Sequence, residues 1–135
     1  MKRFSVRDGM GVDRLRTLLR IETGIVSGES SGSLVRRAKK LGIAEVHLGV
    51  RDKLALVETL AARLGWDPIQ IAYIGDDVND LAAMKRVGLS ACPADAEPEV
   101  ASVAEFVCRA PGGRGAFREL AELLIRASKG GEPAA

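Results

Sequence analysis

Short runs rich in β-branched residues alternate with amphipathic stretches along this chain. Each run with the composition of a buried strand is followed by apolar residues at helical spacing. The predicted strands are residues 23–27, 45–49, 71–74, 89–91 and 106–108. The predicted helices include residues 12–19, 34–41, 56–64, 81–84 and 117–124, and Gly42, Gly65 and Gly88 end three of them.

This alternation predicts a parallel sheet with helices on both faces, the doubly wound α/β class. We find no internal repeat and no linker, and 135 residues are enough for one domain with its own core. We therefore expect a single domain over residues 1–128. The segment 129–135 is rich in Gly, Pro and Ala and predicts a flexible tail.

Composition narrows the classes of function. The aromatic content is only 4%, so the predicted core is aliphatic, and the net charge is +2. The basic residues of 36–40 lie among apolar residues at helical spacing and indicate a solvated helix face rather than a nucleic-acid patch. No apolar run reaches the length of a membrane span, and no secretory signal opens the chain. We expect a cytoplasmic protein with no nucleic-acid or membrane partner.

Three carboxylates follow the predicted strand 71–74 within five positions: Asp76, Asp77 and Asp80. In a doubly wound sheet, ligands bind at the carboxyl ends of the strands. Carboxylates this close repel one another unless a cation lies among them, and oxygen ligands suit a hard ion such as Mg²⁺. The plainer alternative is a loop whose acids cap the next helix, a role that suits Asp80 in particular. We interpret the group as a magnesium site.

Two other strand ends carry residues that suit phosphate chemistry. Ser27 and Gly28 precede a predicted helix, so a hydroxyl, backbone N–H groups and the helix dipole would face an anion, although a plain helix cap explains them equally well. Lys53 lies in a first helical turn, where the dipole disfavours a positive charge, which indicates pairing with phosphate and carboxylates. An ordinary exposed lysine is the alternative. Phosphoryl transfer needs this combination of metal, cation and anion-directed donors.

Four stretches carry a family resemblance: residues 4–11, 73–77, 87–90 and 112–116. Together they resemble the haloacid-dehalogenase phosphatases, and more narrowly the 3-deoxy-D-manno-octulosonate 8-phosphate phosphatase branch, from Phe4 to about Leu124. That branch includes modules fused to acylneuraminate (sialic acid) cytidylyltransferases. Glu29, where the octulosonate enzymes usually have arginine, favours these sialic-acid-associated members. The resemblance implies a Rossmann-like fold, a magnesium cofactor and a homotetramer.

The resemblance also implies catalytic roles for four residues. Ser27 would hold the phosphoryl group, and Lys53 would balance charge on the phospho-enzyme. Asp76 would ligate Mg²⁺, and Asp77 would support the metal site.

Further residues are assigned to the substrate site. By the resemblance, Arg7 and the backbone at Gly9 would line the pocket. Arg114 would reach the carboxylate of a phosphorylated sugar acid, often from a neighbouring subunit. We add Gly28 and Asn79 to this substrate-binding set.

The sequence departs from the family in one large respect. The family's first motif is an Asp-x-Asp at the end of the central strand, upstream of a β-hairpin flap. Its first Asp forms the aspartyl-phosphate, and its second is a general acid. Only three residues precede Phe4 here, and Asp8 belongs to a different motif. We therefore expect a sheet without the usual first strand and flap hairpin, and a chain that is inactive alone.

Two hypotheses follow from this departure. The first is a phosphatase domain for a phosphorylated sugar acid, octulosonate 8-phosphate or nonulosonate 9-phosphate, whose nucleophile lies outside these residues. The alternative is a non-catalytic module that assembles or supports an acylneuraminate cytidylyltransferase. A general small-molecule binding domain of the same sheet class accounts less well for the acid cluster and Lys53.

Overall fold

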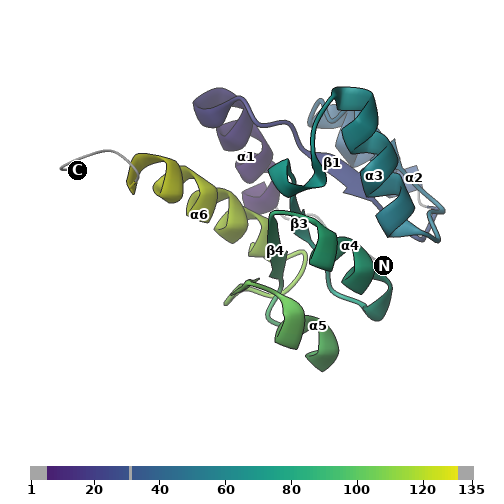
Figure 1. The fold of residues 1–135 in the computed structure, drawn as a ribbon. Helices are drawn as coiled ribbons and strands as arrows, with labels where there is room; N and C mark the ends of the chain where they lie inside the picture. The colour runs from purple at the N-terminus through teal and green to yellow at the C-terminus, as the bar shows by residue number, and fades with distance from the viewer. Residues whose placement is uncertain (1–5, 31, 131–135) are drawn as a thin grey trace.

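The computed structural model describes residues 6–30 and 32–130. Five short strands alternate with helices, as the apolar periodicity predicts (Figure 1). The strands are β1 (Gly24–Val26), β2 (Glu45–His47), β3 (Ala72–Ile74), β4 (Leu89–Cys92) and β5 (Phe106–Val107). The α-helices are α1 (Val6–Arg14), α2 (Gly32–Lys40), α3 (Lys53–Leu64), α4 (Leu81–Arg86), α5 (Pro98–Val103) and α6 (Ala116–Gly130).

Single helical turns complete the path of the chain. A π-helical turn, η1 (Leu15–Leu19), continues α1, and 3-10 turns follow at η2 (Pro68–Gln70) and η3 (Val78–Asp80).

Helix α3 shows how local sequence sets the ends of an element. The Asp52 side chain accepts a hydrogen bond from the N–H of Ala55 at 3.0 Å, and Gly65 ends the helix with a φ of 74°. Only glycine adopts that left-handed conformation without strain.

All strand pairs are parallel, which confirms the predicted α/β class. Strand β1 pairs with β2, and β3, β4 and β5 pair in that order. In the described residues the strands form two sheets rather than one. The break falls between β1 and β3.

Each sheet has its own aliphatic core. Val12, Ala38 and Ile43 pack with residues of β1 and β2. Met84, Cys92 and Val100 pack between β4, α4 and α5. A third cluster joins η1 to α6, and α6 also packs beside α1 (Figure 1).

The structure differs from the sequence predictions in two elements. Helix α5 was not predicted, although Pro98 stands at its first position, where proline favours a helix start. Helix α6 runs to Gly130, beyond the predicted end at residue 124. The flexible tail over 129–135 stays a prediction, and residues 131–135 lie outside the described residues.

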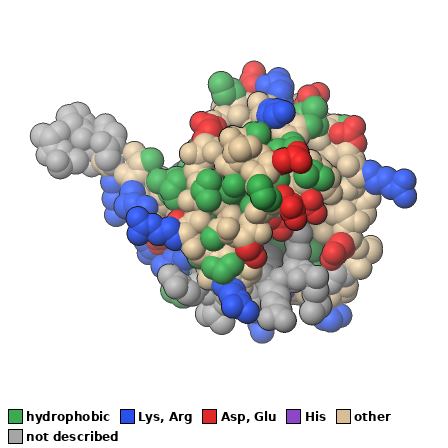
Figure 2. All heavy atoms as spheres, turned by 90° about the horizontal axis from the view of Figure 1, so that it is seen from below, with side chains coloured by type: hydrophobic (Ala, Val, Ile, Leu, Met, Phe, Trp, Pro, Cys, Tyr) green, Lys and Arg blue, Asp and Glu red, His purple; other side chains and the backbone are tan. Residues whose placement is uncertain are grey.

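The surface carries mixed charges. On the face seen in Figure 2, basic side chains lie mainly toward the rim, and several acidic side chains lie nearer the middle. Among the described residues, no helix is long and apolar enough to cross a membrane.

Candidate functional site

Polar residues that follow β2 and β3 contact one another, and the loop after β1 lies beside them. Lys53, the first residue of α3, points its Nζ at Asp80 Oδ1 (2.8 Å) and Asn79 Oδ1 (3.4 Å). A Cβ on Gly28 would lie 3.9 Å from Asn79 Nδ2, so the loop after β1 lies against the loop after β3. Ser27 directly precedes that glycine.

Ser27 is fixed by its own loop. Its side chain is buried, and its Oγ accepts a hydrogen bond from the N–H of Glu29 at 3.1 Å. Its backbone N–H donates to His47 O, and its carbonyl accepts from Val50, both at 2.9 Å. This bond closes a local turn rather than the helix cap that was predicted as the plainer role, because α2 begins only at Gly32. Because that turn uses only a lone pair of Oγ, the hydroxyl retains a proton to donate.

Asp80 accepts four hydrogen bonds, although the sequence analysis gave it a place only in the carboxylate group or as a helix cap. Oδ1 accepts from Lys53 Nζ and from the Tyr73 hydroxyl at 2.5 Å. Oδ2 accepts the N–H groups of Asp76 (3.0 Å) and Asp77 (3.1 Å). Asp80 precedes α4 but makes no side-chain cap there, so the cap predicted for it is not found; instead it forms a reciprocal pair with Asp77 around η3 and holds the loop to Lys53.

The protonation of this cluster follows from its surroundings. Burial acts to raise the pKa of Asp80, but hydrogen bonds from Lys53, Tyr73 and the Asp77 N–H outweigh it and hold the pKa below its usual value. Burial raises the pKa of Tyr73, and its hydrogen bond to Asp80 adds to the effect. The stable arrangement is a carboxylate between a neutral phenol and a lysine, two groups that each donate a hydrogen bond to it.

The three carboxylates do not gather around one point, which corrects the argument for a shared cation. Asp80 turns inward to Lys53, so a lysine rather than a metal ion neutralises it. Asp77 is exposed, and its Oδ1 accepts from the N–H of Val78 at 2.7 Å. Within residues 6–30 and 32–130, no three Asp, Glu, His or Cys side chains are placed to hold a metal. Asp76 is half-buried, and within the same residues its carboxylate accepts no hydrogen bond and makes no ion pair, so it is available to a cation.

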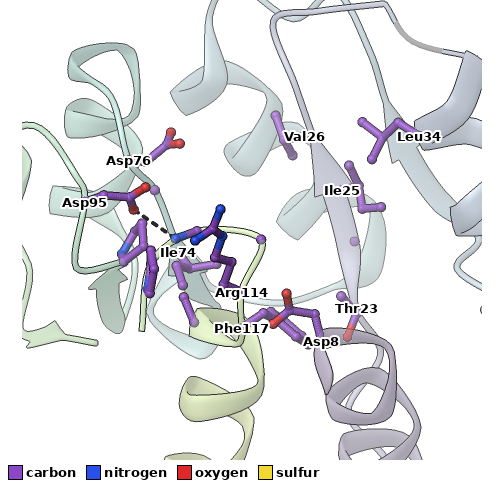
Figure 3. A pocket seen from close by; sticks show the side chains of 17 residues that line it. Asp8, Thr23, Ile25, Val26, Leu34, Ile74, Asp76, Asp95, Arg114 and Phe117 are labelled. Atoms are coloured by element: carbon purple, nitrogen blue, oxygen red, sulfur yellow. Dashed lines mark hydrogen bonds between the residues drawn. The ribbon is translucent and has the colours of Figure 1, made fainter. Parts of the chain in front are cut away.

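A cavity of about 580 Å³ opens between β1 and β3 (Figure 3). Asp76 and Asp95 lie on one side of it, Ile25 and Val26 lie on the other, and Arg114 extends between them. The Gly112 N–H donates to Asp95 Oδ1 at 2.9 Å, which ties the glycine-rich loop 112–115 to the loop after β4. The cavity is therefore lined by acidic and basic side chains as well as by apolar ones.

The predicted site residues divide between this cavity and the polar cluster beside it. Asp76 and Arg114 line the cavity, whereas Ser27 and Lys53 do not. Gly9 does not line it either: Gly9 is buried in α1, and a Cβ there would lie 3.2 Å from Leu41 Cδ2.

Arg7 belongs to α1, but its side chain lies outside what the structure describes. The sequence analysis missed Asp95, which follows β4 in the same way that Asp76 follows β3. It also missed Tyr73, whose contact with Asp80 no local pattern reveals. The roles of all these residues stay predictions.

The fold is an α/β domain with parallel strands, and a serine, a buried lysine and an available carboxylate follow the carboxyl ends of three of them. The family model for haloacid dehalogenase-like hydrolases matches residues 36–116. This chain belongs to the haloacid dehalogenase-like hydrolases, as its motifs predicted.

Named relatives confirm the branch as well. The 3-deoxy-D-manno-octulosonate 8-phosphate phosphatase of Yersinia pestis is 43% identical over 127 residues, which are 94% of this chain and 67% of that protein. The cobalt-bound octulosonate 8-phosphate phosphatase of Haemophilus influenzae superposes with a TM-score of 0.89 and 37% identity, over 96% of this chain and 75% of that one.

The Moraxella catarrhalis 3-deoxy-D-manno-octulosonate 8-phosphate phosphatase is similar to the same extent. Its structure contains a magnesium ion, a phosphate ion and a KDO molecule. It has a TM-score of 0.89 and 36% identity, over 94% of this chain and 72% of that one. The association with cytidylyltransferases stays a prediction.

Proposed function

We propose that this chain forms the body of a magnesium-dependent phosphatase that acts on a phosphorylated sugar acid. Octulosonate 8-phosphate and nonulosonate 9-phosphate are the candidate substrates. Support comes from the relatives, from the bonds of Lys53 to Asn79 and Asp80, and from Gly28, next to Ser27, which lies beside Asn79. The placement of Lys53 carries the proposal, because burying a lysine at a helix start is costly unless a fixed anion compensates it.

The free carboxylate of Asp76 fits a magnesium ion. It is an oxygen ligand at the carboxyl end of β3, and it opens onto the cavity. Because Mg²⁺ keeps several waters and binds through few protein carboxylates, one free carboxylate suits weak binding. Bound there with support from Asp77, the ion would stabilise the charge on the transferring phosphoryl oxygens.

The other residues have roles that their contacts support. Ser27 keeps a hydroxyl proton with which to donate to a phosphate oxygen, and Lys53 supplies positive charge at a place that Asp80 fixes. Arg114 is exposed in the cavity wall, where its planar guanidinium suits the carboxylate of a sugar acid. Gly28 lies beside Asn79, and the backbone of the loop after β1 can approach a ligand oxygen there without a side chain in between.

We further propose that these 135 residues do not turn over substrate alone. The family mechanism needs an aspartate that attacks phosphorus, and the sequence contains no Asp-x-Asp. Asp76 follows β3 and is assigned to the metal, while Asp80 is bonded to Lys53. The chain would therefore bind Mg²⁺ and substrate without cleaving the ester.

Calorimetry with Mg²⁺ tests the metal assignment independently of turnover. We expect Asp76→Asn to weaken magnesium binding at least tenfold, because the amide lacks the negative charge of the carboxylate. Asp13→Asn, at an exposed position on α1, is the matched control and should leave binding unchanged. Equal affinities in the parent chain and Asp76→Asn would refute the assignment.

Phosphate release from octulosonate 8-phosphate tests inactivity. With saturating Mg²⁺, the purified chain should release phosphate no faster than buffer. Turnover that disappears in Asp76→Asn would show that the nucleophile lies within these residues.

A further inference from the structure

The turn that follows β4 contacts two loops of the candidate site. In this turn, residues 94–97, the N–H of Glu97 donates to the carbonyl oxygen of Asp76 at 3.0 Å. The N–H of Ala94 donates to the carbonyl oxygen of Ala110 at 2.9 Å. The turn therefore joins the loop after β3, which carries the proposed metal ligand, to the chain that follows β5.

Asp95 adds a side-chain contact to these backbone bonds. Its Oδ1 accepts the N–H of Gly112 at 2.9 Å, and Figure 3 shows this bond beside Arg114. A charged acceptor makes a shorter and stronger hydrogen bond than a neutral one. Asp95 therefore holds the start of the glycine-rich loop 112–115 to the same turn that contacts Asp76.

The glycine-rich loop needs such an anchor. Arg114 lies between Gly113 and Gly115, whose φ values are 72° and 112°. Glycine has more backbone freedom than other residues, so a loop rich in glycine loses more conformational entropy when it is ordered. The Gly115 N–H donates to Asp8 at 3.4 Å, which holds the far end of the loop. Asp95 holds the near end, so the two acids together fix the backbone from which Arg114 extends.

The negative charge of Asp95 does not itself favour a substrate carboxylate. Asp95 lines the same cavity as Arg114, and a carboxylate there repels another one. If charge were its main contribution, removing Asp95 would strengthen the binding of a sugar acid. If its hydrogen bond to Gly112 matters more, removing Asp95 would weaken that binding. The two accounts therefore predict opposite results.

We propose that Asp95 is a positioning residue, which sets the separation between Arg114 and the metal ligand Asp76. The inference rests on the proposed function, in which Arg114 contacts the carboxylate of a phosphorylated sugar acid and Asp76 holds Mg²⁺ beside its phosphate. In octulosonate 8-phosphate these two groups stand at opposite ends of one carbon chain. A site that recognises both must hold its two binding groups at a fixed separation. Through the turn 94–97, Asp95 connects one group to the other.

Calorimetry on the purified chain, with saturating Mg²⁺ and octulosonate 8-phosphate, tests this role. We expect Asp95→Ala to weaken substrate binding about tenfold, because binding must then order the loop that carries Arg114. Asp95→Asn keeps an oxygen that accepts the Gly112 N–H, so its affinity should stay within about twofold of that of the parent chain. Glu97→Ala is the matched control. It removes an acid of the same turn whose side chain makes no helix cap, and it should leave the affinity unchanged.

Two further measurements separate positioning from a general disturbance of the turn. The affinity for Mg²⁺ should be the same in Asp95→Ala as in the parent chain, because Asp76 is held to the turn through the backbone N–H of Glu97. Weaker magnesium binding would show that the whole turn had moved, and it would overturn the positioning role. Hydrogen exchange at the Gly112 N–H should be about tenfold faster in Asp95→Ala than in Asp95→Asn. Equal exchange would mean that other contacts hold the loop, with the same consequence for the proposal.

Arg114→Ala distinguishes this inference from the proposed function. Adding Asp95→Ala to Arg114→Ala should cause no further loss of affinity, because Asp95 acts through Arg114. If the parent chain does not bind octulosonate 8-phosphate, or Arg114→Ala binds it equally well, the assigned substrate contact fails and the inference fails with it. If Arg114→Ala weakens binding but Asp95→Ala does not, the proposed function stands and the inference alone is overturned. Tighter binding by Asp95→Ala would also overturn it, since charge would then be the main effect of Asp95.

Discussion

At the residue scale, the polar site depends on the pairing of Asp80 with Lys53. Both side chains are about 4% exposed or less, and each satisfies the other. Asp80 also accepts the N–H groups of Asp76 and Asp77, so it sets the loop that carries the free carboxylate. The energetics of this pair are asymmetric: a buried ion pair adds little net stability, but the loss of one partner leaves an uncompensated charge.

We expect Asp80→Asn to lower the free energy of unfolding by about 3–5 kcal/mol, measured by urea denaturation at pH 7. The reason is that Lys53 would remain buried without a counter-charge. Arg63→Ala is the control: it removes an ion pair with Glu45 that is exposed to solvent, and it should change stability little.

The pH dependence of the free energy of unfolding distinguishes the effect of the charge of Asp80 from the effect of its shape. Because the folded-state pKa of Asp80 is lowered, its charge contributes stability above the unfolded pKa of about 4. That contribution is lost as the pH falls through the folded-state pKa of Asp80. The difference between the parent chain and Asp80→Asn should therefore narrow in acid. A constant difference down to pH 2 would contradict the electrostatic account.

At the element scale, the connection from α4 to β4 depends on a glycine that packs against backbone. A Cβ on Gly88 would lie 1.8 Å from the carbonyl oxygen of Ile69 in η2. The Gly88 N–H also donates to Ile71 O at 3.1 Å, so this residue is held on both sides. A carbonyl in a packed turn cannot rotate away as a flexible side chain can, so any side chain at this position would displace η2 or β4.

Gly88→Ala should therefore lower the free energy of unfolding by at least about 2 kcal/mol. The measurement is the shift of the midpoint of urea denaturation, with the dependence of the unfolding free energy on urea concentration unchanged. Gly28→Ala is the matched control, since its added Cβ would meet only ordinary contacts at 3.6 Å and 3.9 Å. That variant should remain within about 0.5 kcal/mol of the parent. A Gly88→Ala chain as stable as Gly28→Ala would show that η2 moves freely.

The elements differ in how far the sequence predicts them. The five strands and most helices were predicted because their apolar periodicity is local. Residues 97–99 contain two glutamates around a proline, so α5 shows little apolar periodicity, and only the proline position marks its start. The contact of Tyr73 with Asp80 depends on how β3 and η3 fold against each other, and sequence spacing does not predict it. The spacing of the carboxylates likewise did not reveal that Asp80 points inward.

At the scale of the whole molecule, the first and last helices hold the two sheets together. Leu15 of η1, which continues α1, packs with Ala121 and Ile125 of α6, and Arg14 of α1 forms an ion pair with Glu122 of α6. Asp8 of α1 lines the cavity and also bonds to the start of α6. Because β1 and β3 do not pair with each other, this helix pair and the Lys53–Asp80 bridge carry much of the cohesion between the halves.

The carboxylate of Asp8 serves as a cap supplied by a distant part of the chain. It accepts hydrogen bonds from the N–H of Arg118 at 3.2 Å and of Gly115 at 3.4 Å, and it is 3% exposed. These N–H groups stand at the start of α6, where a helix has no internal partners for them and where its dipole favours a negative charge. Asp8→Ala should therefore lower the free energy of unfolding by about 1–2 kcal/mol.

Asp8→Asn distinguishes the hydrogen bonds from the charge. The amide of Asp8→Asn retains an oxygen acceptor but loses the interaction with the helix dipole. The free energy of unfolding should therefore fall less in Asp8→Asn than in Asp8→Ala. Asp13→Ala, whose side chain is 68% exposed on the same helix, controls for removing an acid from α1 and should change little. Hydrogen exchange at the Arg118 N–H should speed up in Asp8→Ala before the protein unfolds globally, because the start of α6 loses its cap. Unchanged exchange at that position would mean that other contacts hold α6 against α1.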